Sequence, residues 1–227
     1  MKNIFFAALI LTVFSVACNT NSKENKSQKM VVETEDLGEK KVEEKKKIIF
    51  FGNSITAGYQ LAPESAFPNL IQMKLDSLGL NYECVNAGVS GETTTGGLQR
   101  VDWVTKGAVD VFVLELGAND GLRGLPLEET HSNLVSIIKR VQSANPNVKV
   151  LLCGMEVPPN MGDEYAREFR EIFINVSNET DVPLLNFLLE KVAGKKELNL
   201  SDGIHPTEEG HKLVAQTVWK ALEPLLD

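Results

Sequence analysis

Short apolar runs alternate with amphipathic segments over most of this chain. The apolar runs lack polar alternation, as expected of strands that are covered on both faces of a sheet. They predict five strands, over residues 47–52, 82–87, 111–117, 148–153 and 182–186, of which the last contains Pro183 and is expected at an edge. Apolar residues with a near-helical period predict helices over residues 67–78, 94–106, 126–144, 163–180 and 206–222.

This alternation predicts an α/β domain with a five-stranded parallel sheet and helices on both faces. One such domain accounts for residues 48–227, which show neither an internal repeat nor a second core. Ligands of open parallel sheets bind beyond the carboxyl ends of the strands, so the chemistry is expected at that edge.

The first 47 residues do not follow this pattern. Residues 1–18 place a lysine before an apolar stretch and small residues before Cys18, which is typical of a secretory signal. A membrane-spanning helix is the alternative, but the apolar stretch is shorter than the roughly 20 residues that such a helix needs. Residues 19–47 are polar and of mixed charge, and we expect them to form a disordered tether.

The run Ser-Val-Ala-Cys at residues 15–18 resembles a bacterial lipobox. The resemblance implies cleavage before Cys18 and a diacylglyceryl group on its thiol, and hence an exported protein anchored to a membrane of the bacterial cell envelope. Ordinary secretion with an incidental cysteine is the alternative. Asn19 is not the aspartate that marks retention at the inner membrane in some bacteria, which favours the outer membrane.

The net charge of the predicted domain limits the classes of molecule that we expect it to bind. The first 47 residues hold 9 of the 23 basic and 7 of the 31 acidic residues, so residues 48–227 carry 14 basic and 24 acidic side chains, a net charge of −10. A surface this acidic disfavours nucleic acid as a partner. A metal site is not expected either, because the three histidines are scattered and the cysteines lack ligand spacing.

Four polar segments follow or flank the predicted strands, and each holds a residue suited to acyl transfer. They are residues 50–61, 86–97, 115–121 and 202–211. Ser54 follows the first strand between two glycines, where a hydroxyl nucleophile gains access to a substrate. Asp202 and His205 are three residues apart, so the carboxylate can orient the imidazole, which then accepts the serine proton. The alternatives are an N-capping serine, an N-capping aspartate and a surface histidine.

Two further residues are candidates for binding an oxyanion. Gly88 lets its backbone N–H approach a substrate closely, and Asn119 offers a side-chain amide. Together with the N–H of Ser54 they make a three-donor oxyanion hole. A loop glycine and a turn asparagine are the alternatives. His131 and His211 lie within predicted helices, and we expect both on the solvated surface. This chemistry requires no cofactor.

The four segments, in this order and at these separations, resemble the conserved blocks of the SGNH (GDSL-type) hydrolases, and within them the thioesterase I, lysophospholipase and arylesterase branch. The resemblance implies a flavodoxin-like three-layer α/β/α fold, with Ser54 as nucleophile, His205 as base, Asp202 as its orienting carboxylate, and Gly88 and Asn119 as oxyanion donors. It departs at Asn53, where the family usually has aspartate; we expect Asn53→Asp to leave turnover within about tenfold.

Other expectations follow from this fold. Cys84 and Cys153 lie on strands that two others separate, too far for a disulfide, so we expect two buried free thiols. Residues 154–162 contain two prolines and two methionines and are candidates for the wall of an acyl pocket, while Arg123 is a candidate for contact with an anionic group. We expect a monomeric serine esterase that acts on small or lipid esters. A carbohydrate O-acetyl esterase and a non-catalytic binding lipoprotein are the alternatives.

Overall fold

The computed structural model describes residues 44–226. The predicted signal peptide with Cys18, and residues 19–43 of the predicted tether, lie outside these residues. The first strand, β1, begins at Lys46, two residues before the boundary placed at residue 48. None of the helices over residues 44–226 combines the length and apolarity that crossing a membrane requires.

Five parallel strands form one sheet in the order β2-β1-β3-β4-β5, which is the flavodoxin-like order and confirms the predicted fold class. Their bounds are β1 (Lys46–Gly52), β2 (Tyr82–Gly88), β3 (Val111–Glu115), β4 (Lys149–Cys153) and β5 (Leu184–Leu185). The two-residue β5 lies at the edge, as predicted from its proline.

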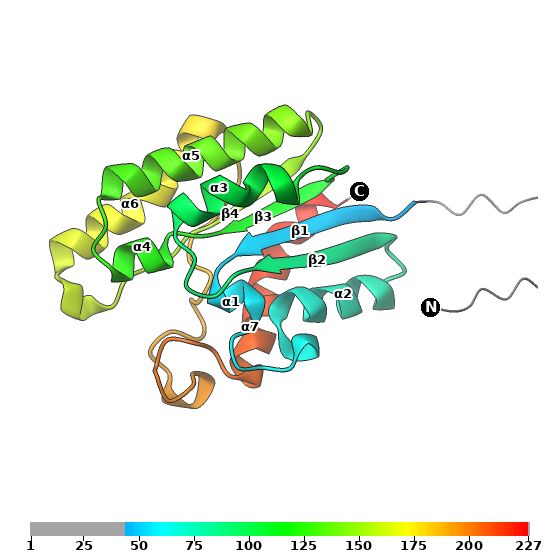
Figure 1. Ribbon diagram of the computed structural model, residues 1–227. Coiled ribbons are helices and arrows are strands. Elements are labelled where there is room, and N and C mark those ends of the chain that lie inside the picture. The colour runs from blue at the N-terminus through cyan, green and yellow to red at the C-terminus, as the bar shows by residue number, and fades with distance from the viewer. Residues whose placement is uncertain (1–43, 227) are drawn as a thin grey trace, which may run out of the picture. The chain divides into compact units, whose positions relative to one another are not determined.

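Over residues 44–226, seven α-helices connect and cover the strands. They are α1 (Ser54–Ala57), α2 (Phe67–Ser77), α3 (Thr94–Val104), α4 (Ala118–Leu122), α5 (Leu127–Ala144), α6 (Asp163–Thr180) and α7 (Glu208–Leu222). Figure 1 shows α3, α5 and α6 on one face of the sheet and α2 and α7 on the other. The five helices predicted from the apolar period are all present, whereas the short α1 and α4 were not predicted as helices.

The sheet is buried because helices cover both of its faces. Ile48, Phe50 and Phe51 of β1 are fully buried, and so is every residue of β3. This burial explains why these strands read as continuous apolar runs in the sequence. The rigid layers leave the carboxyl ends of β1, β2 and β3 side by side, with Gly52 opposite both Gly88 and Glu115 in register.

Cys84 lies on β2 and Cys153 on β4, and both are free thiols, with two strands between them as expected. Cys153 is buried, but Cys84 is only half-buried, so the prediction of two buried thiols is wrong for Cys84. The reason is that β2 is an edge strand, whose burial pattern is much weaker than that of β1 or β3.

Candidate active site

Ser54 lies at the abrupt turn from β1 into α1. Asn53 caps this helix, because its Oδ1 accepts a hydrogen bond from the Ile55 N–H at 3.0 Å. Gly52 is required here, since a Cβ on it would stand 2.2 Å from Thr56 Oγ1 and 2.5 Å from Glu115 Oε2. The turn therefore places the Ser54 hydroxyl at the carboxyl edge of the sheet.

A chain of hydrogen bonds connects Ser54, His205 and Asp202. The Nε2 atom of His205 is 2.8 Å from Ser54 Oγ, and its Nδ1 is 2.7 Å from Asp202 Oδ2. With the proton assigned to Nδ1, the ring donates to the carboxylate and accepts from the serine hydroxyl. This is the arrangement in which a histidine can take the proton of an attacking serine.

Asp202 is held in its ionised form. Its slight burial raises the pKa, but the N–H groups of His205 and Ile204, at 3.0 and 2.9 Å, and the His205 ring outweigh that effect and lower the pKa to about 2. Asp202 thus accepts from two backbone N–H groups of its own turn and contacts the imidazole. It does not cap α7, whose N-cap is Thr207.

Tyr59 is a site residue that the sequence analysis missed. Its ring lies against that of His205, with 4.4 Å between ring centroids and a tilt of 37°. The stacking covers one face of the His205 ring and restricts its rotation, while the ring nitrogens contact Asp202 and Ser54. Tyr59 comes just after Gly58, which has a left-handed backbone, so no hydrophobic period indicated its position.

Gly88 approaches α1 as closely as the backbone permits. A Cβ on Gly88 would stand 2.3 Å from the Ala57 nitrogen, so another residue would displace α1. Its N–H donates to Asn86 Oδ1 at 3.0 Å, while Asn86 Nδ2 donates to the Thr56 carbonyl at 2.8 Å. In this structure the N–H of Gly88 is thus engaged by Asn86, and an oxyanion would have to share or replace that contact.

Asn119 lies in the first turn of α4, after Gly117. Its Nδ2 donates to the Glu92 carbonyl at 3.0 Å, which fixes the orientation of the amide. An amide nitrogen carries two hydrogens, so Asn119 has a second one to offer to an oxyanion.

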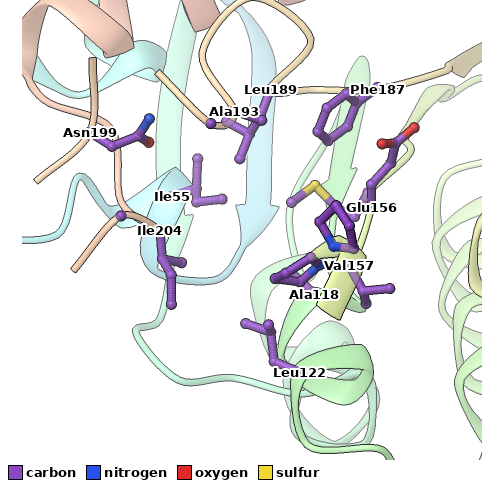
Figure 2. Close-up of a pocket in the computed structure, with 15 residues that line it drawn as sticks. Ile55, Ala118, Leu122, Glu156, Val157, Phe187, Leu189, Ala193, Asn199 and Ile204 are labelled. Carbon is purple, nitrogen blue, oxygen red and sulfur yellow. The ribbon is translucent and has the colours of Figure 1, made fainter. Parts of the chain in front are cut away.

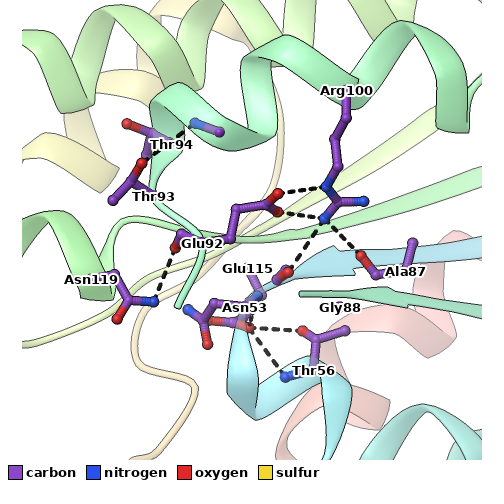
Figure 3. Close-up of polar contacts among 12 residues, drawn as sticks. Asn53, Thr56, Ala87, Gly88, Glu92, Thr93, Thr94, Arg100, Glu115 and Asn119 are labelled. Atoms are coloured by element: carbon purple, nitrogen blue, oxygen red, sulfur yellow. Dashed lines mark hydrogen bonds and ion pairs between the residues drawn. The ribbon is translucent and has the colours of Figure 1, made fainter. Parts of the chain in front are cut away.

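An ion pair between Glu92 and Arg100 holds the loop that orients Asn119 (Figure 3). Arg100 Nε donates to Glu92 Oε1 at 2.6 Å, and Nη2 donates to Glu92 Oε2 and, at 2.8 Å, to the Ala87 carbonyl. The guanidinium also lies 3.9 Å from the Phe51 ring centroid. Because the pair is largely shielded from water, we expect it to restrain the segment between Gly88 and α3.

An apolar cavity of about 400 Å³ opens beside the triad (Figure 2). Its lining includes Ile55, Ala118 and Ile204, which adjoin Ser54, Asn119 and His205 in the sequence. In Figure 2 the side chains of Ile55 and Ile204 face those of Ala118 and Leu122 across the cavity. The remaining lining is Met155, Glu156, Val157, Pro158, Pro159, Phe187, Leu189, Ala193, Gly194, Asn199 and Gly203. The segment 154–162, predicted as an acyl wall, contributes five of these residues.

One predicted surface residue, His211, differs from the structure. His211 is buried, at 1% exposure, and its Nδ1 accepts from the Phe67 N–H at 3.2 Å, so the prediction of a solvated side chain is wrong. Burial, with a smaller effect from the charge of His205, lowers the pKa of His211 to about 4. Arg123, a candidate for contact with an anionic group, is exposed and donates through Nη2 to the Gly91 carbonyl at 2.8 Å, so its other N–H groups remain for such a contact. His131 is half-exposed, 3.6 Å from Glu179. Over residues 44–226 no cluster of side chains suits a metal ion.

Comparisons with known proteins show the family to which this chain belongs. The sequence model of the GDSL-like Lipase/Acylhydrolase family matches residues 50–213. An arylesterase of Vibrio mimicus is 35% identical over 177 residues, which cover 78% of this chain and 88% of that protein. Thioesterase 1/protease 1/lysophospholipase L1 of Escherichia coli strain K12 is 36% identical over 181 residues, covering 79% and 85%. The crystal structure of TesA superimposes with a TM-score of 0.77 at 34% identity, covering 80% of this chain and all of TesA.

Proposed function

This chain belongs to the GDSL-like lipase/acylhydrolase family, and we propose that it is a serine esterase in which Ser54 attacks the ester carbonyl. The observation that carries this assignment is the unbroken contact from Ser54 Oγ through His205 to Asp202, at 2.8 and 2.7 Å. Neither of the other histidines reaches Ser54, because His131 lies near Glu179 and His211 is committed to the Phe67 N–H.

Each step of the reaction uses a group of the site described above. As the Ser54 oxygen bonds to the carbonyl carbon, its proton passes to His205 Nε2, and Asp202 stabilises the imidazolium. The carbonyl oxygen becomes an oxyanion, which accepts hydrogen bonds from the Ser54 N–H and from Asn119, and from the Gly88 N–H as it shares or leaves its contact with Asn86 Oδ1. His205 then donates the proton to the departing alkoxide, and water attacks the acyl-enzyme by the same route in reverse.

The cavity beside Ser54 defines the acyl group. A volume of about 400 Å³ lies within the usual range of about 300–1,000 Å³ for small-molecule sites. Taking about 30 Å³ for an atom group the size of water, and allowing for incomplete filling, it holds roughly ten heavy atoms. We therefore assign esters of medium-length acyl chains as substrates, among them the aryl esters of such acids. Each buried methylene contributes about 0.8 kcal/mol to binding.

The location of the enzyme is also a proposal. The apolar stretch and lipobox-like run that end at Cys18 support export and a diacylglyceryl anchor, with the polar segment that follows as a tether to a monomeric domain. Such an anchor keeps the enzyme close to membrane esters. A Cys18→Ala variant that stays in the membrane fraction of the producing bacterium would contradict the anchor.

The function is tested by initial rates of the purified protein on p-nitrophenyl esters from acetyl to palmitoyl, beside Ser54→Ala. Ser143→Ala, which changes an exposed serine on α5, is the matched control. We expect the highest rate at medium chain length, lost in Ser54→Ala and unchanged in the control. A peak at acetyl would favour the carbohydrate O-acetyl esterase, and equal rates in wild type and Ser54→Ala would refute the assignment.

A further inference from the structure

Glu115 is a buried carboxylate beneath the turn that carries Ser54. It ends β3 and is fully buried, opposite Gly52 in register. Buried carboxylates in proteins are usually balanced by a cation. Over residues 44–226 no cation forms an ion pair with Glu115, which is satisfied instead by neutral donors of the nucleophile turn.

The two residues that supply these donors lie on either side of Ser54 and Ile55. Glu115 Oε1 accepts from Asn53 Nδ2 at 2.6 Å. Glu115 Oε2 accepts from Thr56 Oγ1 at 2.7 Å, from the Asn53 N–H at 3.1 Å and from the Thr56 N–H at 3.3 Å. Figure 3 shows Asn53 and Thr56 converging on this carboxylate. Both ends of the turn are therefore attached to one rigid point at the end of β3.

Each hydrogen bond of this network joins a donor to an acceptor, so no proton has to be shared between two acceptors. Asn53 uses both ends of its amide, because Nδ2 donates to Glu115 while Oδ1 accepts from the Ile55 N–H at 3.0 Å. The same Oδ1 lies 3.4 Å from Ser54 Oγ, so any rotation of the Asn53 amide is transmitted to the nucleophile. Burial raises the pKa of Glu115 to about 7, and the hydrogen bonds from Thr56 and Asn53 oppose that rise.

We propose that Asn53 and Glu115 form one donor–acceptor pair that positions Ser54 for attack. Neither residue touches the substrate; the pair fixes the direction of the Ser54 hydroxyl toward His205. An aspartate at position 53 would place a second carboxylate oxygen within hydrogen-bond distance of Glu115 Oε1. The two groups would then repel each other or share a proton. The inference rests on the proposed role of Ser54 as nucleophile.

Exchanging the amide of Asn53 and the carboxylate of Glu115 tests the proposed pair. In Glu115→Gln an amide replaces the carboxylate, so at least one donor of the turn faces another donor. In Asn53→Asp two carboxylates meet. In the double variant Asn53→Asp/Glu115→Gln, the glutamine Nε2 donates to the aspartate, while its oxygen still accepts from the Thr56 and residue-53 N–H groups. The hydrogen bond is thus restored in the reverse direction.

The assay is hydrolysis of a p-nitrophenyl ester by the full-length protein at pH 8, with kcat and KM measured separately. We expect kcat to fall about 100-fold or more in Glu115→Gln and severalfold, up to about tenfold, in Asn53→Asp, with KM within about threefold. The double variant should return to within about fivefold of wild type. Glu168→Gln, which changes an exposed carboxylate on α6, is the control and should match wild type.

The outcomes separate a positioning role of the pair from an effect on folding. Single variants with wild-type kcat, or a double variant that shows both losses combined, would overturn the proposal. If Glu115→Gln does not fold, Thr56→Val removes one hydrogen bond at nearly constant shape; it should lower kcat but not KM, and an unchanged kcat would overturn the proposal. A wild-type protein without Ser54-dependent hydrolysis would refute the proposed function itself, whereas an active wild type without rescue would refute only the pair.

Discussion

Acid should destabilise this protein through His211, and replacing His211 by asparagine should remove that sensitivity. The imidazole is buried against Phe67, with 6.2 Å between the stacked rings, and its Nδ1 accepts from a backbone N–H. Only the neutral ring can accept there. Burial accordingly lowers the pKa of His211 from its ordinary 6.5 to about 4. Asparagine keeps an acceptor near the same place but cannot be protonated.

The sign and size of the change in the free energy of unfolding follow from the linkage between proton binding and folding. Below pH 6.5 the unfolded chain binds a proton at His211 that the folded protein does not bind until about pH 4. The stabilising contribution is therefore complete above pH 6.5 and is lost as the pH falls toward 4. At about 1.4 kcal/mol per pH unit, the interval from pH 6.5 to about 4 corresponds to about 3.5 kcal/mol; about 3 kcal/mol of it is lost by pH 4, where His211 of the folded protein is half protonated.

The assay is urea unfolding of wild type and His211→Asn at pH 7 and pH 4, at equal ionic strength. Glu115 acts in the opposite direction, because its raised pKa gives stability that is present below pH 4.5 and lost as the pH rises through 7. Glu115 is common to both proteins and cancels in the comparison. His131→Asn, on the surface of α5, is the control and should keep the wild-type dependence.

The variant itself should be less stable than wild type at pH 7, since it loses the ring that packs against Phe67. Between pH 7 and pH 4, however, wild type should lose about 3 kcal/mol more than His211→Asn. Parallel losses in the two proteins would refute the reasoning, because they would show that His211 binds its proton equally well in the folded and unfolded chain.

Three further predictions concern the site and the thiols. Asn119→Ala should lower kcat by about 10²–10³-fold with little change in KM, as measured on the preferred ester; a loss confined to KM would argue against an oxyanion donor. Leu189→Trp should partly fill the cavity and shorten the preferred acyl chain, with about a fourfold loss in kcat/KM for each excluded methylene; an unchanged chain-length profile would place the acyl group elsewhere. In a Cys18→Ser background, Cys153 should react with a thiol reagent only on unfolding and the half-buried Cys84 only slowly in the folded protein, because burial raises the pKa of both thiols, that of Cys84 to about 12; fast reaction of the folded protein would contradict this.

The fold was largely predictable because its strands are covered on both faces. Segments such as residues 48–51 and 111–114 are continuous apolar runs, and the alternating amphipathic segments fixed the parallel topology. The helices α1 and α4 were missed for a physical reason. They contain four and five residues, too few to show a helical period, and capping and backbone turns define them instead.

The candidate site was predictable in its parts, and its supporting contacts were not. Ser54, Asp202 and His205 were proposed from their positions near strand ends and from spacing, and the structure brings them together. The burial of His211 had a signal that was overlooked, since it lies three residues before Val214 and seven before Val218 on the inward side of α7.

Glu115 also had a signal, because it is a charged residue inside an apolar strand. Its partners depend on the register of β1 against β3, which pairs Gly52 with Glu115 and which no local pattern specifies. No local pattern specifies the contact of Tyr59 with His205 either, because the two residues are 146 positions apart in the chain.

The central claim is that Ser54 is the activated nucleophile, and labelling with a fluorophosphonate probe followed by peptide mapping tests it most directly. We expect one adduct on the peptide that contains Ser54, absent in Ser54→Ala and formed far more slowly in His205→Ala, while Ser143→Ala is labelled like wild type. An adduct on another residue, or an enzyme that hydrolyses esters without labelling at Ser54, would contradict it.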